Sequence, residues 1–165
     1  RDIAARLREL AQTTLETRRT LIHGNVSPKN ILVGPAGPVF LDAECAVYGD
    51  PAFDIAFCLN HLLLKCMARP DSIHGLLESY RCLAGSYMSG VSWESKNAVE
   101  TRACHLIPAL LLARVDGKSP VTYLNEADKA TTRRFARLNL IAPPKNLKQL
   151  ANMWRNAIAD GTSAL

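Results

Sequence analysis

A polar loop between two short apolar runs constrains this chain more than any other stretch. Residues 21–33 read Leu-Ile-His-Gly-Asn-Val-Ser-Pro-Lys-Asn-Ile-Leu-Val, and a third apolar run, 39–41, ends at the carboxylate of Asp42. A Gly-Pro-Ala-Gly-Pro turn joins the runs at 31–33 and 39–41, so these are predicted to form a β-hairpin, with residues 20–22 as a strand entering the loop. A loop of His, Asn and Lys that faces an acidic strand end is suited to holding a metal ion and a phosphate.

The rest of the chain is predicted to be helical. Apolar residues at helical spacing predict six helices, at residues 2–18, 52–67, 72–88, 93–115, 126–140 and 147–159. The second helix is apolar on nearly every side, which is typical of a central buried helix. Gly49 and Pro51 predict an irregular loop over residues 43–51, and Pro108 predicts a kink or break in the fourth helix. The fold class is therefore α+β, mostly α, with residues 1–165 as a single domain.

Composition argues against several classes of function. The 165 residues are enough to bury a core, and the net charge of +5 comes from 20 scattered Lys and Arg against 15 Asp and Glu. The basic stripe with interleaved aromatics of a nucleic-acid binder is missing. No apolar run reaches the roughly 20 residues that cross a bilayer, and no signal peptide is recognisable, so we expect no membrane partner and a cytoplasmic location.

The five cysteines show no Cys-x-x-Cys spacing, and four of them lie in apolar helical stretches. We interpret all five as reduced core residues rather than as metal ligands or disulfides. They are Cys45, Cys58, Cys66, Cys82 and Cys104.

The spacing His23-x-Asn25-x-x-x-x-Asn30, followed by a strand-terminal Asp42, matches the phosphoryl-transfer template of kinases at all positions but one. An amide oxygen and a carboxylate can hold Mg²⁺ against nucleotide phosphates. The template also needs a carboxylate that takes the proton of the substrate hydroxyl. Position 25, where that carboxylate is expected, is an asparagine.

Three motifs in order carry a family resemblance over residues 21–57: the polar loop, then Leu-Asp-Ala-Glu at 41–44, then Gly-Asp-Pro-Ala-Phe-Asp-Ile-Ala at 49–56. Together they closely resemble the C-terminal lobe of the aminoglycoside phosphotransferase and choline kinase-like family. The resemblance implies the helical C-terminal lobe of a protein-kinase-like fold, in which a small β-hairpin carries the catalytic loop. It also implies Mg²⁺-dependent transfer of the γ-phosphoryl group of ATP or GTP to a hydroxyl of a small molecule such as an aminoglycoside, choline or a sugar.

The resemblance assigns a role to each matching residue. Asn30 and Asp42 would ligate Mg²⁺ at the nucleotide, and Asn25 occupies the position of the catalytic base. Glu44 would lie near a second metal or the substrate hydroxyls, while His23 would brace the loop. Two further carboxylates would support the site, with Asp54 tying the loop backbone to the central helix and Asp50 able to serve either role.

The asparagine at position 25 predicts weak activity. An amide cannot accept a proton at physiological pH, so if this position is the base, transfer should fall by roughly 10² to 10⁴. Because the chain starts at Arg1 within a helical pattern, we expect a piece of a longer protein whose N-terminal nucleotide-binding lobe lies outside it, and little turnover by this piece alone. A non-catalytic, pseudokinase-like domain that binds a ligand or partner remains an alternative, as does a deliberate substitution at position 25.

Beyond residue 60 the motifs are weaker. The loop at 116–119 lacks the upstream glycine and strand of a phosphate-binding Walker motif, so a structural turn is favoured over a substrate-facing loop in which Arg114, Asp116 and Lys118 line a cleft beside Asp42. Trp93 and Trp154 are interpreted as packing residues. Arg133, Arg134 and Arg137 are interpreted as a solvated helix face.

Overall fold

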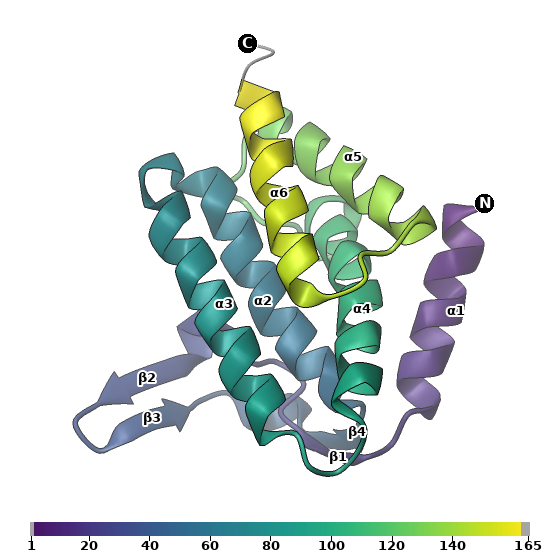
Figure 1. The fold of residues 1–165 in the computed structure, drawn as a ribbon, viewed down its shortest axis with the longest axis vertical. Coiled ribbons are helices and arrows are strands. Elements are labelled where there is room, and N and C mark those ends of the chain that lie inside the picture. Colours follow the sequence, from purple (N-terminus) through teal and green to yellow (C-terminus); the bar gives the residue numbers. More distant parts are fainter. Residues whose placement is uncertain (1, 163–165) are drawn as a thin grey trace.

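The computed structural model describes residues 2–162 and consists mainly of helices, with two small sheets at one end of them (Figure 1). The elements in chain order are α1 (Ile3–Glu16), β1 (Thr20–Ile22), η1 (Pro28–Asn30), β2 (Ile31–Gly34), β3 (Gly37–Phe40), η2 (Ala43–Cys45), β4 (Val47–Gly49), α2 (Pro51–Ala68), η3 (Pro70–Ser72), α3 (Ile73–Gly90), α4 (Lys96–Asp116), α5 (Glu126–Ile141) and α6 (Leu147–Thr162), where η marks a 3-10 turn.

Both sheets are antiparallel pairs. β2 and β3 form the predicted hairpin, in which Ile31 lies opposite Phe40. β1 pairs instead with β4, with Thr20 opposite Gly49. The polar loop of residues 23–30 therefore connects the two sheets, rather than lying within one hairpin.

The prediction of an irregular loop over residues 43–51 is wrong. The segment contains η2 and the strand β4, and Pro51 begins α2, where a missing N–H costs nothing. Gly49 suits the strand because a Cβ there would lie 2.9 Å from the Cδ1 of Ile22. Tyr48 adds a hydrogen bond from its hydroxyl to the carbonyl of Arg19, at 3.0 Å. The pairing of β4 with β1 brings the start of α2 next to the polar loop.

The core is built around α2, as its apolar sequence predicts. α2 packs against α3 and α4, and Leu59, Leu63 and Leu64 are completely buried. The buried indole of Trp154, on α6, donates a hydrogen bond to the carbonyl of Leu63 at 2.9 Å. Within the described residues α2 is the one helix long and apolar enough to cross a membrane, and 61% of that stretch is buried inside the protein. Its composition is therefore what a central core helix requires.

Two further expectations change. α4 runs through Pro108 as one helix, with the proline ring buried, so the helix is not broken there and a kink stays a prediction. All five cysteines are free thiols, but two of them are not core residues. Cys45 lies in the exposed η2 turn, and Cys82 lies on the outer face of α3. Burial raises the pKa values of Cys58 and Cys66 to about 11 and that of Cys104 to about 12. Trp93 is partly exposed at the edge of the helices.

Candidate active site

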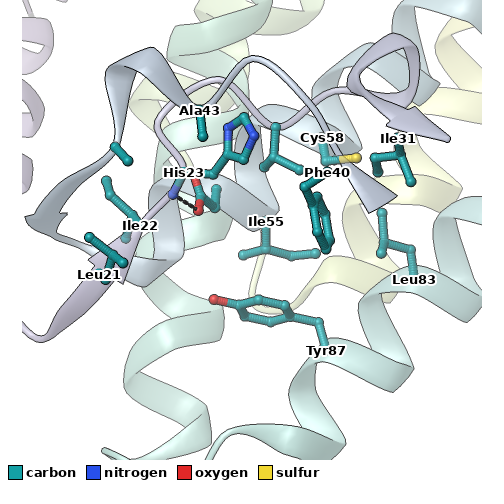
Figure 2. Close-up of a pocket in the computed structure, with 13 residues that line it drawn as sticks. Leu21, Ile22, His23, Ile31, Phe40, Ala43, Ile55, Cys58, Leu83 and Tyr87 are labelled. Carbon is teal, nitrogen blue, oxygen red and sulfur yellow. Dashed lines mark hydrogen bonds between the residues drawn. The ribbon is translucent and has the colours of Figure 1, made fainter. Parts of the chain in front are cut away.

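Asp54 fixes the start of the polar loop from below. Its two carboxylate oxygens accept hydrogen bonds from the backbone N–H groups of His23, at 2.7 Å, and Gly24, at 2.9 Å. Figure 2 shows the bond to His23 as a dashed line. Asp54 lies in the first turn of the buried helix α2, so charge-assisted hydrogen bonds tie the loop directly to the central helix of the core.

His23 links the loop to the end of β3. Its Nε2 lies 2.9 Å from the carbonyl oxygen of Leu41, and its Nδ1 lies 3.2 Å from the backbone nitrogen of Asn25. The carbonyl can only accept and the amide can only donate, so the ring carries its proton on Nε2. With both nitrogens engaged in this way, the geometry supports a bracing role for His23.

Gly24 is required by the backbone. Its φ is +74°, and a Cβ at this position would lie 2.5 Å from the carbonyl oxygen of Cys45. A side chain would therefore clash with the η2 turn that follows Asp42. The close approach holds the polar loop and the η2 turn together.

Three polar side chains converge on one point, namely those of Asn25 and Asn30 in the loop and that of Asp42 after β3. The Nδ2 group of Asn25 donates to the Asp42 carboxylate at 2.6 Å, and the Nδ2 group of Asn30 lies 3.3 Å from the same oxygen. The Nδ2 group of Asn30 also donates to the backbone carbonyl of Asn25 at 2.9 Å, so this side chain ties the loop backbone to Asp42. Asp42 is exposed, and its carboxylate remains open to solvent beyond these two donors.

The backbone of Asp42 is unusual. It adopts φ 64° and ψ 46°, which makes it the only non-glycine of the described residues with a positive φ. This left-handed conformation is uncommon outside glycine and is found where the surrounding structure enforces it, often at functional sites. Here it ends β3 and turns the carboxylate toward the two asparagines.

Asp50, at the N-terminus of α2, is held by a separate set of contacts. It is 1% exposed, caps α2 through the N–H of Ala52, and accepts two hydrogen bonds from the Nε of Arg102 at 3.0 and 3.1 Å. The remaining guanidinium nitrogens of Arg102 bind both oxygens of Glu94, at 2.7 and 3.0 Å. The sequence left two roles open for Asp50, and these contacts favour the structural one.

Comparison with known proteins agrees with this geometry. The model of the phosphotransferase enzyme family, APH, matches residues 1–86, a span that begins with α1 and includes the loop, Asp42 and all of α2. The chain belongs to this phosphotransferase family. No curated protein matches it. The resemblance inferred from the sequence motifs is therefore confirmed.

The phosphotransferase residues Asn30 and Asp42 fit a Mg²⁺ ion by their chemistry. Asn30 offers a buried amide and Asp42 an exposed carboxylate. The open side of Asp42 leaves room for the waters and phosphate oxygens that Mg²⁺ usually retains. Glu44, in the exposed η2 turn, lies two residues beyond Asp42. The described residues contain no group of three or more His, Cys, Asp or Glu able to hold a metal.

A largely apolar cavity of about 420 Å³ lies below the polar loop. Ile31 and Phe40 of the hairpin line one part of it, and Leu83 and Tyr87 of α3 line another (Figure 2). The carboxylate of Asp54 is the one charged group in its wall, and that carboxylate is already bound to the loop backbone. The cavity is thus suited to apolar groups rather than to phosphates.

The structure separates Arg114, Asp116 and Lys118, the residues of the alternative substrate-facing interpretation. The carboxylate of Asp116 binds the guanidinium of Arg133 at 2.7 Å and lines a hollow between α1 and α4, away from Asp42. Arg114 is half-buried, and its charge helps to lower the pKa of His61 on α2. Lys118 is exposed in the following loop. Arg133 is therefore part of an ion pair, rather than simply a solvated residue.

Sequence reasoning missed Glu94 and Arg102. Neither belongs to a motif, and Arg102 lies 52 residues from its partner Asp50. The only sequence signal was the carboxylate of Asp50 itself at the start of an apolar helix, since a buried charge requires a partner somewhere.

Proposed function

We propose that this chain forms the metal- and acceptor-binding lobe of an enzyme that transfers the γ-phosphoryl group of ATP or GTP to a hydroxyl of a small molecule. The observation that carries the proposal is the convergence of Asn25 and Asn30 on the Asp42 carboxylate, at 2.6 and 3.3 Å, above a loop anchored by Asp54. Membership of the phosphotransferase family supports the reaction class.

Each residue has a distinct task in this proposal. Asn30 and Asp42 would hold Mg²⁺, with Glu44 beside them, and the bound ion would neutralise the charge of the phosphates. Asn25 would orient the acceptor hydroxyl through its amide oxygen, because its Nδ2 group is engaged with Asp42. Asn25 cannot take the hydroxyl proton, so the catalysis available to this chain comes from positioning and charge.

We also propose that an N-terminal nucleotide-binding lobe covers the β2–β3 hairpin. Large apolar side chains are unusually exposed there, with Val33 at 84% and Leu32, Val39 and Phe40 at 56% each. These side chains lie on both faces of the hairpin, because Leu32 pairs with Val39 and the neighbouring pair is Ile31 with Phe40. Large exposed apolar side chains gathered on one small element commonly mark an interface. The five free thiols support a reducing, cytoplasmic location.

The substitution Asn25→Asp tests the proposed site. The new carboxylate would lie next to that of Asp42, so the variant should unfold at a lower temperature than the parent in EDTA and gain more stability from Mg²⁺. In the protein extended by the nucleotide-binding lobe, ATP consumption with a panel of amino sugars, choline and sugar alcohols should rise by roughly 10² to 10⁴.

Asn97→Asp is a matched control, because Asn97 is exposed at the start of α4. This control should leave the response to Mg²⁺ unchanged. No gain in activity by Asn25→Asp on any acceptor, together with an unchanged response to Mg²⁺, would contradict the assignment of Asn25, Asn30 and Asp42 to the reaction centre.

One observation favours a second function, that of a non-catalytic binding lobe. The hydrogen bond from Asn25 satisfies the Asp42 carboxylate without a metal ion, which an aspartate at position 25 would not do. Such a lobe would bind Mg²⁺ and nucleotide without turnover. Nucleotide binding that is unaffected by Asn25→Asp, with no activity in either form, would support this alternative.

A further inference from the structure

Beyond the polar loop, one face of α2 carries a row of aromatic rings. Phe53, Phe57 and His61 follow one another at intervals of four residues, with 5.7 Å between the first two ring centroids and 5.0 Å between the last two. All three are half-buried. The 3-10 turn η1, which contains Lys29 and Asn30, packs against α2. The aromatic row therefore extends away from the proposed reaction centre along the central helix.

Three basic side chains lie near the far end of this row. Lys65 follows His61 by about one turn of α2, and Lys29 and Arg114 are close enough for their charges to act on the imidazole. We call Lys29, Lys65, Arg114 and His61 the basic cluster. The ammonium group of Lys65 lies 3.9 Å from the ring centroid of Tyr123, in the loop between α4 and α5. Burial, together with the charges of Arg114, Lys29 and Lys65, lowers the pKa of His61 to about 4. His61 is therefore neutral at pH 7, and the three cations are close enough to act on it together.

The positive charge of the basic cluster is not balanced by the protein. None of the ion pairs found in the described residues includes Lys29, Lys65 or Arg114. The acidic residues that flank Tyr123 along the chain are bound elsewhere, with Asp116 paired to Arg133 and Glu126 to Lys129. The Nε of Arg114 is also buried without a hydrogen-bond partner. A buried guanidinium nitrogen with no partner is costly unless a ligand satisfies it.

We propose that the basic cluster binds an anionic group, a carboxylate or a phosphate, carried by the hydroxyl compound that this lobe phosphorylates. Arg114 and Lys65 bind the anion, and neutral His61 is a hydrogen-bonding partner for a hydroxyl. Phe57 and Tyr123 cover the carbon skeleton, while Lys29 connects the cluster to Asn30. The inference rests on the proposed function for the identity of the ligand as an acceptor, and it argues against a polycationic acceptor such as an aminoglycoside.

The test uses matched probes of one carbon skeleton: gluconate and glucose 6-phosphate as anions, glucose as the neutral compound and glucosamine as the cation. Binding is followed through the imidazole NMR signals of His61, with exposed His74 of α3 as an internal reference. The anionic probes should shift the His61 signals in a saturable manner, and glucose and glucosamine should bind at least about tenfold more weakly.

Lys65→Gln and Arg114→Gln should each weaken binding of the anionic probes by about tenfold or more. Lys148→Gln is the matched control, because Lys148 is an exposed helical lysine next to Leu147, whose N–H binds Glu100 near the opposite end of α4. This control should bind like the parent. Lys65 is also exposed, so its variant is expected to fold even if Arg114→Gln is destabilised.

Glucosamine binding as tightly as gluconate would overturn the inference, as would unchanged affinity in both cluster variants or no shift of His61 with either anion. Displacement of gluconate by Mg²⁺-ATP, in the protein extended by the nucleotide-binding lobe, would assign the cluster to the nucleotide and also overturn it. The probes bind without turnover, so the two proposals can fail separately. Anion binding with no effect of Asn25→Asp on Mg²⁺ response or activity would count against the proposed function alone.

Discussion

The two ends of α2 treat charge in opposite ways. At its start, the carboxylates of Asp50 and Asp54 are bound by the protein itself, to Arg102 and to the backbone of the polar loop. Toward its other end, Lys65 and the nearby Arg114 take part in none of the ion pairs of the described residues. The charges at the start of α2 are therefore balanced by the protein, whereas the cations near its other end are not.

This difference separates residues that build a site from residues that bind something. Burying Asp50 and part of Arg102 costs desolvation free energy, which the hydrogen bonds to Glu94 and Ala52 help to offset. The result is a fixed start for α2, the helix that carries Asp54. The basic cluster has no such partners, which is the arrangement expected where a ligand supplies the missing charge.

The largest expected effect lies at the start of the helix. Asp50→Ala removes the α2 cap and leaves the part-buried Arg102 with only Glu94, so the free energy of unfolding should fall by about 3–5 kcal/mol. Lys65→Ala, at the far end of the same helix, should change it by less than about 0.5 kcal/mol. Urea unfolding followed by circular dichroism measures both. Similar losses in the two variants would remove the distinction between the ends of α2.

A smaller effect is expected at Asp54. Asp54→Asn keeps the shape of the side chain but presents only one acceptor oxygen to the N–H groups of His23 and Gly24, so stability should fall by about 1–3 kcal/mol. Amide hydrogen exchange at these two residues should accelerate more than exchange in the middle of α2. Asp71→Asn in the exposed η3 turn is the control and should leave both quantities unchanged. Unaltered exchange at His23 and Gly24 would show that Asp54 does not hold the loop.

Sequence-based prediction succeeds here where the cause of structure is local. The β2–β3 hairpin follows from its Gly-Pro turn, and α2 follows from a nearly continuous apolar run. The bracing role of His23 and the anchoring role of Asp54 came from a motif and stay predictions, and the structure shows the hydrogen bonds that each role would use. Strand β4 was missed because three residues ending in glycine carry little strand signal, and its pairing with β1 is a tertiary contact.

The basic cluster shows why proximity in sequence misleads. Arg114 and Asp116 were grouped as neighbours along the chain, but residues two positions apart on a helix point in different directions. Asp116 accordingly binds Arg133 of α5. The charge of Arg114 instead helps to lower the pKa of His61 on α2. Lys29, Lys65 and Tyr123 join Arg114 only through folding. No spacing in the sequence indicates that these four residues share a surface.

The smallest expected effect is a pH dependence at the ligand-binding end of α2. The pKa of His61 is about 4 in the folded chain, against an ordinary value of 6.5, because burial and the neighbouring cations disfavour its charged form. Between these values the unfolded chain binds more protons, so the contribution of His61 to stability is complete above pH 6.5 and is lost as the pH falls toward 4. His105 acts in the same direction, because burial and Arg6 also lower its pKa.

Urea unfolding at pH 7 and pH 5 should therefore show a loss of stability on acidification that His61→Gln reduces and His74→Gln, at an exposed site, does not. An unchanged loss in His61→Gln would mean that the imidazole is solvated and that the three cations do not converge on it, and the contrast between the two ends of α2 would then be much weaker.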